Sequence, residues 1–169
     1  MRSSAASDVY KRQLYYRVYA CFTAMRWPLW GESSAMRIAL IAHDSRKELM
    51  AQFCTAYVRI LSENDLIATG VTGKIVHDAT GLPVRTLYPG GRGGAEQIAA
   101  MIGCGEVDML LFFRDPVGAK PGEPNDMMLL RLCDMHTIPV ATNIATAEVL
   151  IHGLERGDLA WIELQRGRK

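Results

Sequence analysis

From residue 36 onward, short runs of consecutive hydrophobic residues alternate with longer segments whose hydrophobic residues recur at helical spacing. The run Arg37–Ala42 (RIALIA) predicts a buried strand, and the next segment places Leu49, Met50, Phe53 and Tyr57 on one side of a helix. The same alternation predicts strands at Arg37–Ala42, Leu66–Thr69, Pro83–Leu87, Val107–Phe113 and Ile138–Ala141, and helices at Lys47–Ser62, Lys74–Thr80, Ala95–Gly103, Asp126–His136 and Ala145–Leu154.

Five apolar strands that alternate with helices are typical of a parallel sheet covered on both faces and joined by right-handed crossovers. The predicted fold class is therefore α/β, a Rossmann-like three-layer fold with a five-stranded parallel sheet. Gly81 is the expected residue just beyond the helix Lys74–Thr80. We expect Gly70–Gly73 to form a tight loop and Pro116–Pro124 to form a proline-rich loop.

Composition and charge exclude several classes of protein. Hydrophobic residues make up 49% and charged residues 22% of the chain, which excludes a disordered protein. No apolar stretch reaches the roughly 18 to 20 residues that a spanning helix needs. The formal net charge of +1 provides no field that would attract nucleic acid or a membrane surface. Four cysteines without a C-x-x-C pair indicate neither zinc nor disulfides and favour a reducing cytoplasm.

The first 35 residues differ in composition from the rest. They carry a formal charge of +3 against −2 for the remainder, and they hold seven of the thirteen aromatic residues without helical or alternating spacing. Asp8–Gln13 reads DVYKRQ, which resembles the translation of a transposon end used in sequencing-library preparation. We interpret residues 1–35 as a non-native leader that arose as an assembly artefact, the alternative being a natural disordered extension. The functional domain would then span residues 36–169 and begin at Met36.

The residues that follow the predicted strands are polar or rich in glycine. In open parallel sheets, ligands bind outside the carboxyl ends of the strands, where the strand order reverses. These positions are therefore the candidate ligand-binding residues: His43 and Asp44, Thr69–Gly73, Gly90–Gly94, Asp115, and Thr142 with Asn143.

Two of these segments have the chemistry of a phosphate site. Thr69–Gly73 offers hydroxyls and backbone N–H groups close to a helix start, where the helix dipole favours an anion, and Lys47 could add a positive charge. An ordinary turn with a Thr N-cap is the alternative. A second glycine-rich segment, Gly90–Gly94, favours phosphate binding. Neither segment matches a Walker loop or the G-x-G-x-x-G dinucleotide fingerprint.

His43, Asp44 and Asp115 are candidates for proton transfer or substrate contact. His43 and Asp44 end a buried strand, although an Asp that caps a helix beside a hydrogen-bonded His would explain that pair equally well. Asp115 lies directly after the most hydrophobic strand and before a proline, where capping alone is a weaker explanation.

Seven segments in order resemble those of the methylglyoxal synthase family. They are IALIAHD-x-x-K, L-x-ATG-x-TG, ATGL, GG-x-GG, VDxLxFFxDP, a P-x-x-P segment before LLRLC, and IPVATNIATAE, and they run from Met36 to about Asp158. The resemblance implies a homohexamer of Rossmann-like subunits that converts dihydroxyacetone phosphate into methylglyoxal and inorganic phosphate. It implies no metal and no organic cofactor.

The resemblance also implies roles for particular residues. The substrate phosphate would be bound by Lys47, Thr69, Gly70, Thr72 and Gly90. The catalytic end of the site would be lined by His43, Asp44 and Asp115. The expected ligand is a small sugar phosphate or inorganic phosphate, and no metal ligands are expected.

Three catalytic positions depart from the family pattern, besides Val71 and Pro89, which replace a Thr and a Ser of the phosphate-binding segments. The family loop S-G-P-x-G-G-D ends in the expected catalytic base, whereas Tyr88–Ala95 reads YPGGRGGA and places Ala95 there. The family segment P-H-x-P-D supplies a His that polarises the carbonyl and an assisting Asp, and this chain has Gly122 and Asn125 instead. Glu96 is a candidate replacement base, or an acidic residue favoured by the dipole of a first helical turn.

Two functions follow from these observations. The first is a methylglyoxal synthase-like lyase, weak or divergent because catalytic positions are substituted. The alternative is a non-catalytic module that binds a phosphorylated metabolite, similar in role to the regulatory domain of this fold in carbamoyl phosphate synthetase. Loss of the base favours the module, and a chain without a partner domain favours the enzyme.

Overall fold

The computed structural model describes residues 35–118, 120 and 126–162. Short 3₁₀ turns at Asp44–Arg46 and Gly90–Arg92 follow two of its strands. Among the described residues, no helix is long and apolar enough to cross a membrane. In chain order the strands and helices are β1 (Arg37–Ala42), α2 (Lys47–Ala56), α3 (Val58–Leu61), β2 (Asp65–Ala68), α4 (Gly70–Thr80), β3 (Val84–Thr86), α5 (Gly94–Gly103), β4 (Met109–Phe113), α6 (Asp126–His136), β5 (Val140–Ala141) and α7 (Ile144–Glu155).

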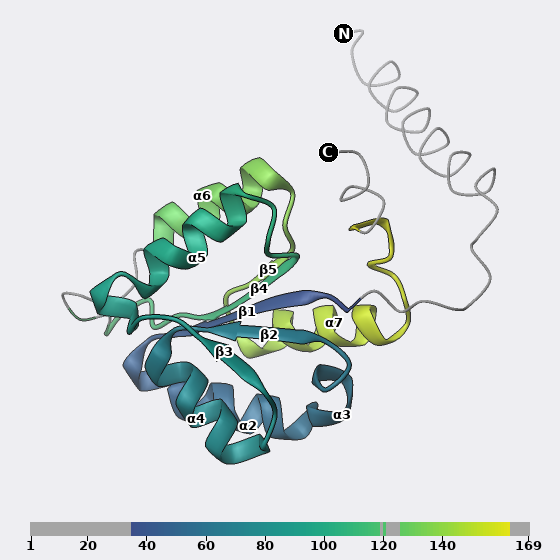
Figure 1. The fold of residues 1–169 in the computed structure, drawn as a ribbon, viewed down its shortest axis with the longest axis horizontal. Helices are drawn as coiled ribbons and strands as arrows, with labels where there is room; N and C mark the ends of the chain where they lie inside the picture. The colour runs from purple at the N-terminus through teal and green to yellow at the C-terminus, as the bar shows by residue number, and fades with distance from the viewer. Residues whose placement is uncertain (1–34, 119, 121–125, 163–169) are drawn as a thin grey trace, which may run out of the picture. The chain divides into compact units, whose positions relative to one another are not determined.

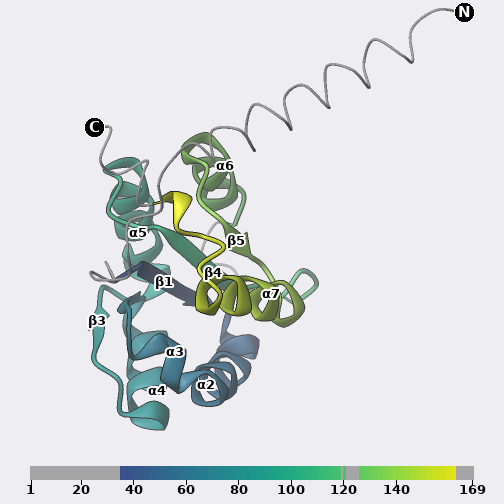
Figure 2. The same ribbon diagram turned by 90° about the vertical axis from the view of Figure 1, so that its right-hand side faces the viewer.

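The strands form one parallel sheet in the order β3-β2-β1-β4-β5. Helices α5 and α6 cover one face, and α2, α4 and α7 cover the other (Figures 1 and 2). Because successive side chains of a strand point to opposite faces, Ile38 and Leu40 of β1 enter one core cluster while Ala39 and Ile41 enter the other. The predicted three-layer α/β fold with a five-stranded parallel sheet is confirmed.

The order of the strands determines which strand ends lie together. The chain builds the sheet outward from β1 to β2 and β3, then returns to the other side of β1 to add β4 and β5. The reversal therefore falls between β1 and β4, which pair from Ile38↔Met109 to Ala42↔Phe113. This is the position where α/β sheets of this kind bind ligands.

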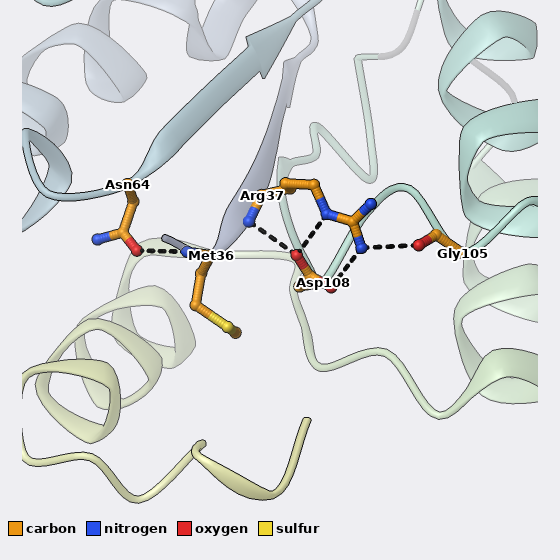
Figure 3. Close-up of polar contacts among 5 residues, drawn as sticks. All are labelled: Met36, Arg37, Asn64, Gly105 and Asp108. Carbon is orange, nitrogen blue, oxygen red and sulfur yellow. Dashed lines mark hydrogen bonds and ion pairs between the residues drawn. The ribbon is translucent and has the colours of Figure 1, made fainter. Parts of the chain in front are cut away.

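Arg37 and Asp108 form an ion pair at the N-terminal end of β1, opposite to the end where the strand order reverses (Figure 3). The guanidinium of Arg37 donates to both carboxylate oxygens of Asp108, Nε to Oδ2 and Nη2 to Oδ1, each at 2.9 Å. The backbone N–H of Arg37 also donates to Asp108 Oδ2 at 2.8 Å, and Nη2 donates to the Gly105 carbonyl at 2.7 Å. Asp108 is 3% exposed, so its charge is buried against the guanidinium that neutralises it.

The prediction of a tight loop at Gly70–Gly73 is wrong, because these residues form the first turn of α4. The glycines serve close packing rather than flexibility. A Cβ on Gly70 would lie 2.8 Å from the Leu87 carbonyl oxygen, and a Cβ on Gly73 would lie 2.5 Å from Cγ2 of Thr86. Gly81 does end α4 as predicted, with φ +72° and its N–H donated to the His77 carbonyl at 2.8 Å.

The helix predicted at Lys47–Ser62 is interrupted at Tyr57. This residue leaves the helical region with φ −109° and ψ 23°, and it divides the segment into α2 and α3. Its ring packs against Phe53 at a centroid distance of 4.8 Å and against His152 of α7 at 5.5 Å. The break between α2 and α3 therefore falls at a residue that packs against α7. The spacing of hydrophobic residues does not show this break.

The leader inferred for residues 1–35 lies outside the described residues except for Ala35. We expect that deleting these 35 residues changes the free energy of unfolding by less than roughly 0.5 kcal/mol, as for substitutions that remove no native contact. Urea denaturation of the full chain and of the chain starting at Met36 would measure the difference. A loss of more than about 1 kcal/mol would contradict the interpretation as a leader.

Candidate functional site

His43 joins β1 to β4 at the point where the strand order reverses. Its backbone N–H donates to the Phe113 carbonyl at 3.1 Å, and its ring Nδ1 accepts the backbone N–H of Asp115 at 2.9 Å. The ring stands at 85° to that of Phe112, with centroids 5.2 Å apart. His43 is only 2% exposed, so these contacts hold the imidazole in one orientation.

Asp44 and Lys47 form an ion pair within one turn of each other. The hydrogen bond and the positive charge of Lys47 lower the pKa of Asp44, so this carboxyl is ionised at neutral pH. Asp44 does not cap α2, because Arg46 occupies the N-cap position of that helix. The capping alternative for Asp44 is therefore wrong, and the carboxylate remains more than half exposed at the sheet edge.

The Asp115 carboxylate is held by three donors. Ser45 Oγ donates to Oδ2 at 2.7 Å, and the backbone N–H groups of Gly118 and Val117 donate to Oδ1 at 2.9 and 3.2 Å. The hydrogen bond from Ser45, followed by those from Gly118 and Val117, lowers the pKa of Asp115 to about 2. Asp115 is therefore ionised and fixes the loop after β4 to the turn after β1.

Ser45 was missed by the sequence analysis. A single serine two residues beyond a strand carries no pattern that distinguishes it from a solvent-facing hydroxyl. Only the pairing of β1 with β4 brings it to Asp115, which lies 70 residues further along the chain.

Thr69 and Thr72 lie at the N-terminus of α4, directly after β2. Thr69 occupies the N-cap position without a capping hydrogen bond from its side chain, and its Oγ1 donates to Thr72 Oγ1 at 3.2 Å. Both residues are buried. The N–H of Gly73 closes the first turn on the Thr69 carbonyl at 2.8 Å. The threonines thus form a hydroxyl pair beside the positive end of the helix dipole. Thr69 is the N-cap residue, as the alternative expected, but its side chain makes no capping hydrogen bond.

The two glycine-containing segments meet at the carbonyl of Tyr88. The N–H of Gly70 donates to this oxygen at 3.0 Å. A Cβ on Gly94 would lie 1.9 Å from the same oxygen, so no other residue fits there without movement of the backbone. Gly90 begins the 3₁₀ turn Gly90–Arg92, which lies between this contact and α5. The structure therefore brings together the two segments that the sequence singled out separately.

Some of the positions that depart from the family pattern fall among the residues that the structure describes, and others do not. Ala95 is fully buried in the first turn of α5 and packs in the core cluster that contains Ile98. Glu96 follows it and is exposed. Gly122 and Asn125 lie outside the described residues.

Other groups lie apart from this edge of the sheet. A cavity of about 1010 Å³ runs along β3 and is lined by residues that include Arg37, Lys74 and Arg85, with only Gly70 shared with the candidate site. Within the described part of the chain, no group of three His, Cys, Asp or Glu side chains could hold a metal ion. Burial raises the pKa of the Cys54 and Cys133 thiols to about 12, which keeps them protonated.

A parallel α/β sheet whose strands β1, β2 and β4 are followed by ionisable and hydroxyl side chains at one edge defines the class of α/β proteins that bind small molecules at that edge. The comparison with known proteins identifies the family within this class. The family description "MGS-like domain" matches residues 50–142.

The chain is similar to the methylglyoxal synthase of Caldicellulosiruptor saccharolyticus, with 57% identity over 129 residues that cover 76% of this chain and 92% of the relative. It is 55% identical to that of Oceanobacillus iheyensis over 134 residues, which cover 79% and 96%. A crystal structure of methylglyoxal synthase from Elizabethkingia anophelis NUHP1 matches with a TM-score of 0.68 at 33% identity, covering 69% of this chain and 77% of that one. The chain belongs to the methylglyoxal synthase family.

Proposed function

We propose that this chain is a methylglyoxal synthase-like lyase that converts dihydroxyacetone phosphate into methylglyoxal and inorganic phosphate. The observation that carries the proposal is 57% identity to a methylglyoxal synthase across 92% of that enzyme. In this reaction a base removes a proton from the hydroxymethyl carbon, on the side of the carbonyl away from the phosphate ester. The resulting enediolate then expels phosphate as the bond between the other carbon and the bridging oxygen breaks, and the enol that remains takes up a proton at carbon to give methylglyoxal.

The phosphate would lie between the N-terminus of α4 and the turn Gly90–Arg92. The contact between Gly70 and the Tyr88 carbonyl supports this placement, because it holds the two segments side by side. Thr69 and Thr72 offer hydroxyls, and Lys47 offers a positive charge at the start of α2. Since the Gly70 N–H is already donated to Tyr88, Gly70 would contribute close packing rather than a hydrogen bond to phosphate.

The reacting carbons would face His43, Asp44 and Asp115. A carboxylate whose pKa is about 2 accepts a proton poorly, so Asp115 orients the site rather than acting as the base. Ala95 offers no base in its place. Lys47 lowers the pKa of Asp44, which makes that carboxylate a weak base as well, so Glu96 is the main remaining candidate. We therefore propose slow turnover, with catalysis supplied mainly by positioning and by hydrogen-bond donors to the enediolate.

A non-catalytic phosphometabolite-binding module is the second candidate function. It is favoured by Ala95, which is fully buried and apolar at the position where the family resemblance implies a catalytic Asp. A binding module would keep the proposed phosphate site but would release no products.

One experiment separates the two functions. The purified full chain is incubated with dihydroxyacetone phosphate, and bound ligand, released phosphate and methylglyoxal are measured together. The lyase releases phosphate and methylglyoxal in equal amounts above the uncatalysed rate, whereas the module binds the compound and leaves it intact. An absence of both binding and products would contradict the proposed function.

The proposed phosphate site, at the N-terminus of α4 and the turn Gly90–Arg92, can be tested separately from turnover. We expect Lys47→Ala and Thr69→Ala each to weaken the binding of inorganic phosphate by about 1.5 to 3 kcal/mol, the range for hydrogen bonds to charged groups. Isothermal titration calorimetry would measure the dissociation constants. Thr80→Ala serves as the control, because Thr80 donates to the Val76 carbonyl at the far end of α4. Equal affinity in all four proteins would refute this placement of the phosphate.

We further propose that the enzyme acts in the cytoplasm, requires no metal or organic cofactor, and assembles as a homohexamer. The resemblance to the family supports these three points. Sedimentation equilibrium of the full chain would give the subunit number, and a monomer at micromolar concentration would contradict the assembly.

A further inference from the structure

The contacts between the turn after β1 and the loop after β4 restrict what His43 can do. We infer that the backbone of Asp115 holds His43 as the neutral imidazole protonated at Nε2, and that Ser45 is a positioning residue that keeps Asp115 in place. Ser45 belongs to none of the residue sets that the family resemblance implies.

The tautomer follows from the direction of one hydrogen bond. The backbone N–H of Asp115 can only donate, and it lies 2.9 Å from Nδ1 of His43. Nδ1 must therefore present its lone pair, so the proton of a neutral imidazole resides on Nε2. Turning the ring by 180° would place a carbon against this N–H, and packing against Phe112 helps to hold the ring.

The hydrogen bonds of the Asp115 side chain fix the orientation of the backbone N–H of the same residue. Ser45 Oγ binds one carboxylate oxygen, and the N–H groups of Val117 and Gly118 bind the other. These three donors hold the Asp115 side chain, and with it the start of the loop after β4. The backbone N–H of Asp115 is thereby kept in position to donate to His43. The carboxylate is anchored at 2.7 Å by Ser45, which is the only side chain among the three donors.

The consequence for catalysis rests on the proposed function. With Nδ1 occupied, the proton that His43 can offer is on Nε2, an atom that is buried in this structure and that a substrate oxygen would have to reach. His43 cannot take up a proton at Nδ1 without losing the bond to Asp115. His43 therefore stabilises negative charge on the substrate and does not serve as the base. This leaves proton abstraction to another group, in line with the slow turnover proposed above.

The tautomer can be measured without any turnover. In the full chain labelled with ¹⁵N-histidine, NMR at neutral pH should show His43 with a protonated Nε2 and an unprotonated Nδ1. Replacing His77, His136 and His152 by Gln one at a time identifies their signals, so the fourth set belongs to His43. A proton on Nδ1, or a doubly protonated ring, would overturn the inference.

The role of Ser45 is tested by a pair of serine variants. Ser45→Ala should raise the pKa of Asp115 from about 2 toward its ordinary range, because the largest cause of the lowering is removed. It should also lower kcat for dihydroxyacetone phosphate several-fold with little change in KM, and Ser45→Thr should restore both. Ser62→Ala is the control, since Ser62 Oγ donates to the Arg59 carbonyl on α3, away from Asp115.

An unchanged Asp115 titration in Ser45→Ala would overturn the positioning role, as would an equal kcat in Ser45→Ala and Ser62→Ala. If the tautomer and the titration behave as expected but no variant turns over dihydroxyacetone phosphate, the arrangement stands and the proposed function fails. The two ideas therefore fail under different results.

Discussion

We expect the triple variant Ala95→Asp, Gly122→His and Asn125→Asp to form methylglyoxal from dihydroxyacetone phosphate about 10²- to 10⁴-fold faster than the unmodified chain, the range that one general acid–base group contributes. The variant restores the base and the two groups that the family resemblance implies. Position 95 lies in the first turn of α5, where the helix dipole offsets part of the cost of a carboxylate at this buried position. Initial rates of phosphate release and of methylglyoxal formation would be measured under saturating substrate.

A matched control keeps the shape of the new side chain but removes the base. Ala95→Asn with the same two other substitutions should remain close to the unmodified chain, because an amide cannot take up the proton. Glu96→Gln in the natural chain should also change little. Full activity in the unmodified chain that collapses on Glu96→Gln would instead show that Glu96 is the base.

The second large effect concerns the buried ion pair at the start of β1. Asp108→Asn should lower the free energy of unfolding by about 3 to 5 kcal/mol, because it leaves the Arg37 guanidinium without its counter-charge in a partly buried position. Asp108 accepts three hydrogen bonds from Arg37, and it lies directly before β4. Urea denaturation followed by circular dichroism would measure the change.

Asp158→Asn is the control for this experiment. Asp158 also pairs with an arginine, Arg156, but both side chains are more than half exposed. Solvent screening limits such a pair to about 0 to 1 kcal/mol. Equal losses for Asp108→Asn and Asp158→Asn would contradict a structural role for the buried pair.

The fold was predictable because strands and helices bury their hydrophobic residues at different periods. Strand β1 has the predicted bounds of Arg37–Ala42, and α6 has the predicted bounds of Asp126–His136. The spacing of hydrophobic residues does not show how helices and strands pack against one another. Gly70 and Gly73 suggested a loop by their type alone, whereas they are glycines because α4 lies against the strand and loop residues Thr86 and Leu87.

The site was predictable in outline because the carboxyl ends of parallel strands share one edge. His43 and Asp115 were selected for this reason, and the structure joins them by a hydrogen bond. The direction of that bond and the part played by Ser45 depend on contacts across 70 or more residues. Such contacts leave no pattern in a single sequence.

The central claim is that the edge formed by β1, β2 and β4 performs lyase chemistry on a sugar phosphate. The most direct test compares kcat/KM for dihydroxyacetone phosphate in the unmodified chain, in Lys47→Ala and in Lys74→Ala, which removes a lysine that lines the cavity along β3. We expect both products from the unmodified chain and from Lys74→Ala, and a loss of about 10- to 150-fold in Lys47→Ala, which corresponds to a charged hydrogen bond. No methylglyoxal from the unmodified chain, or a loss confined to Lys74→Ala, would contradict the account.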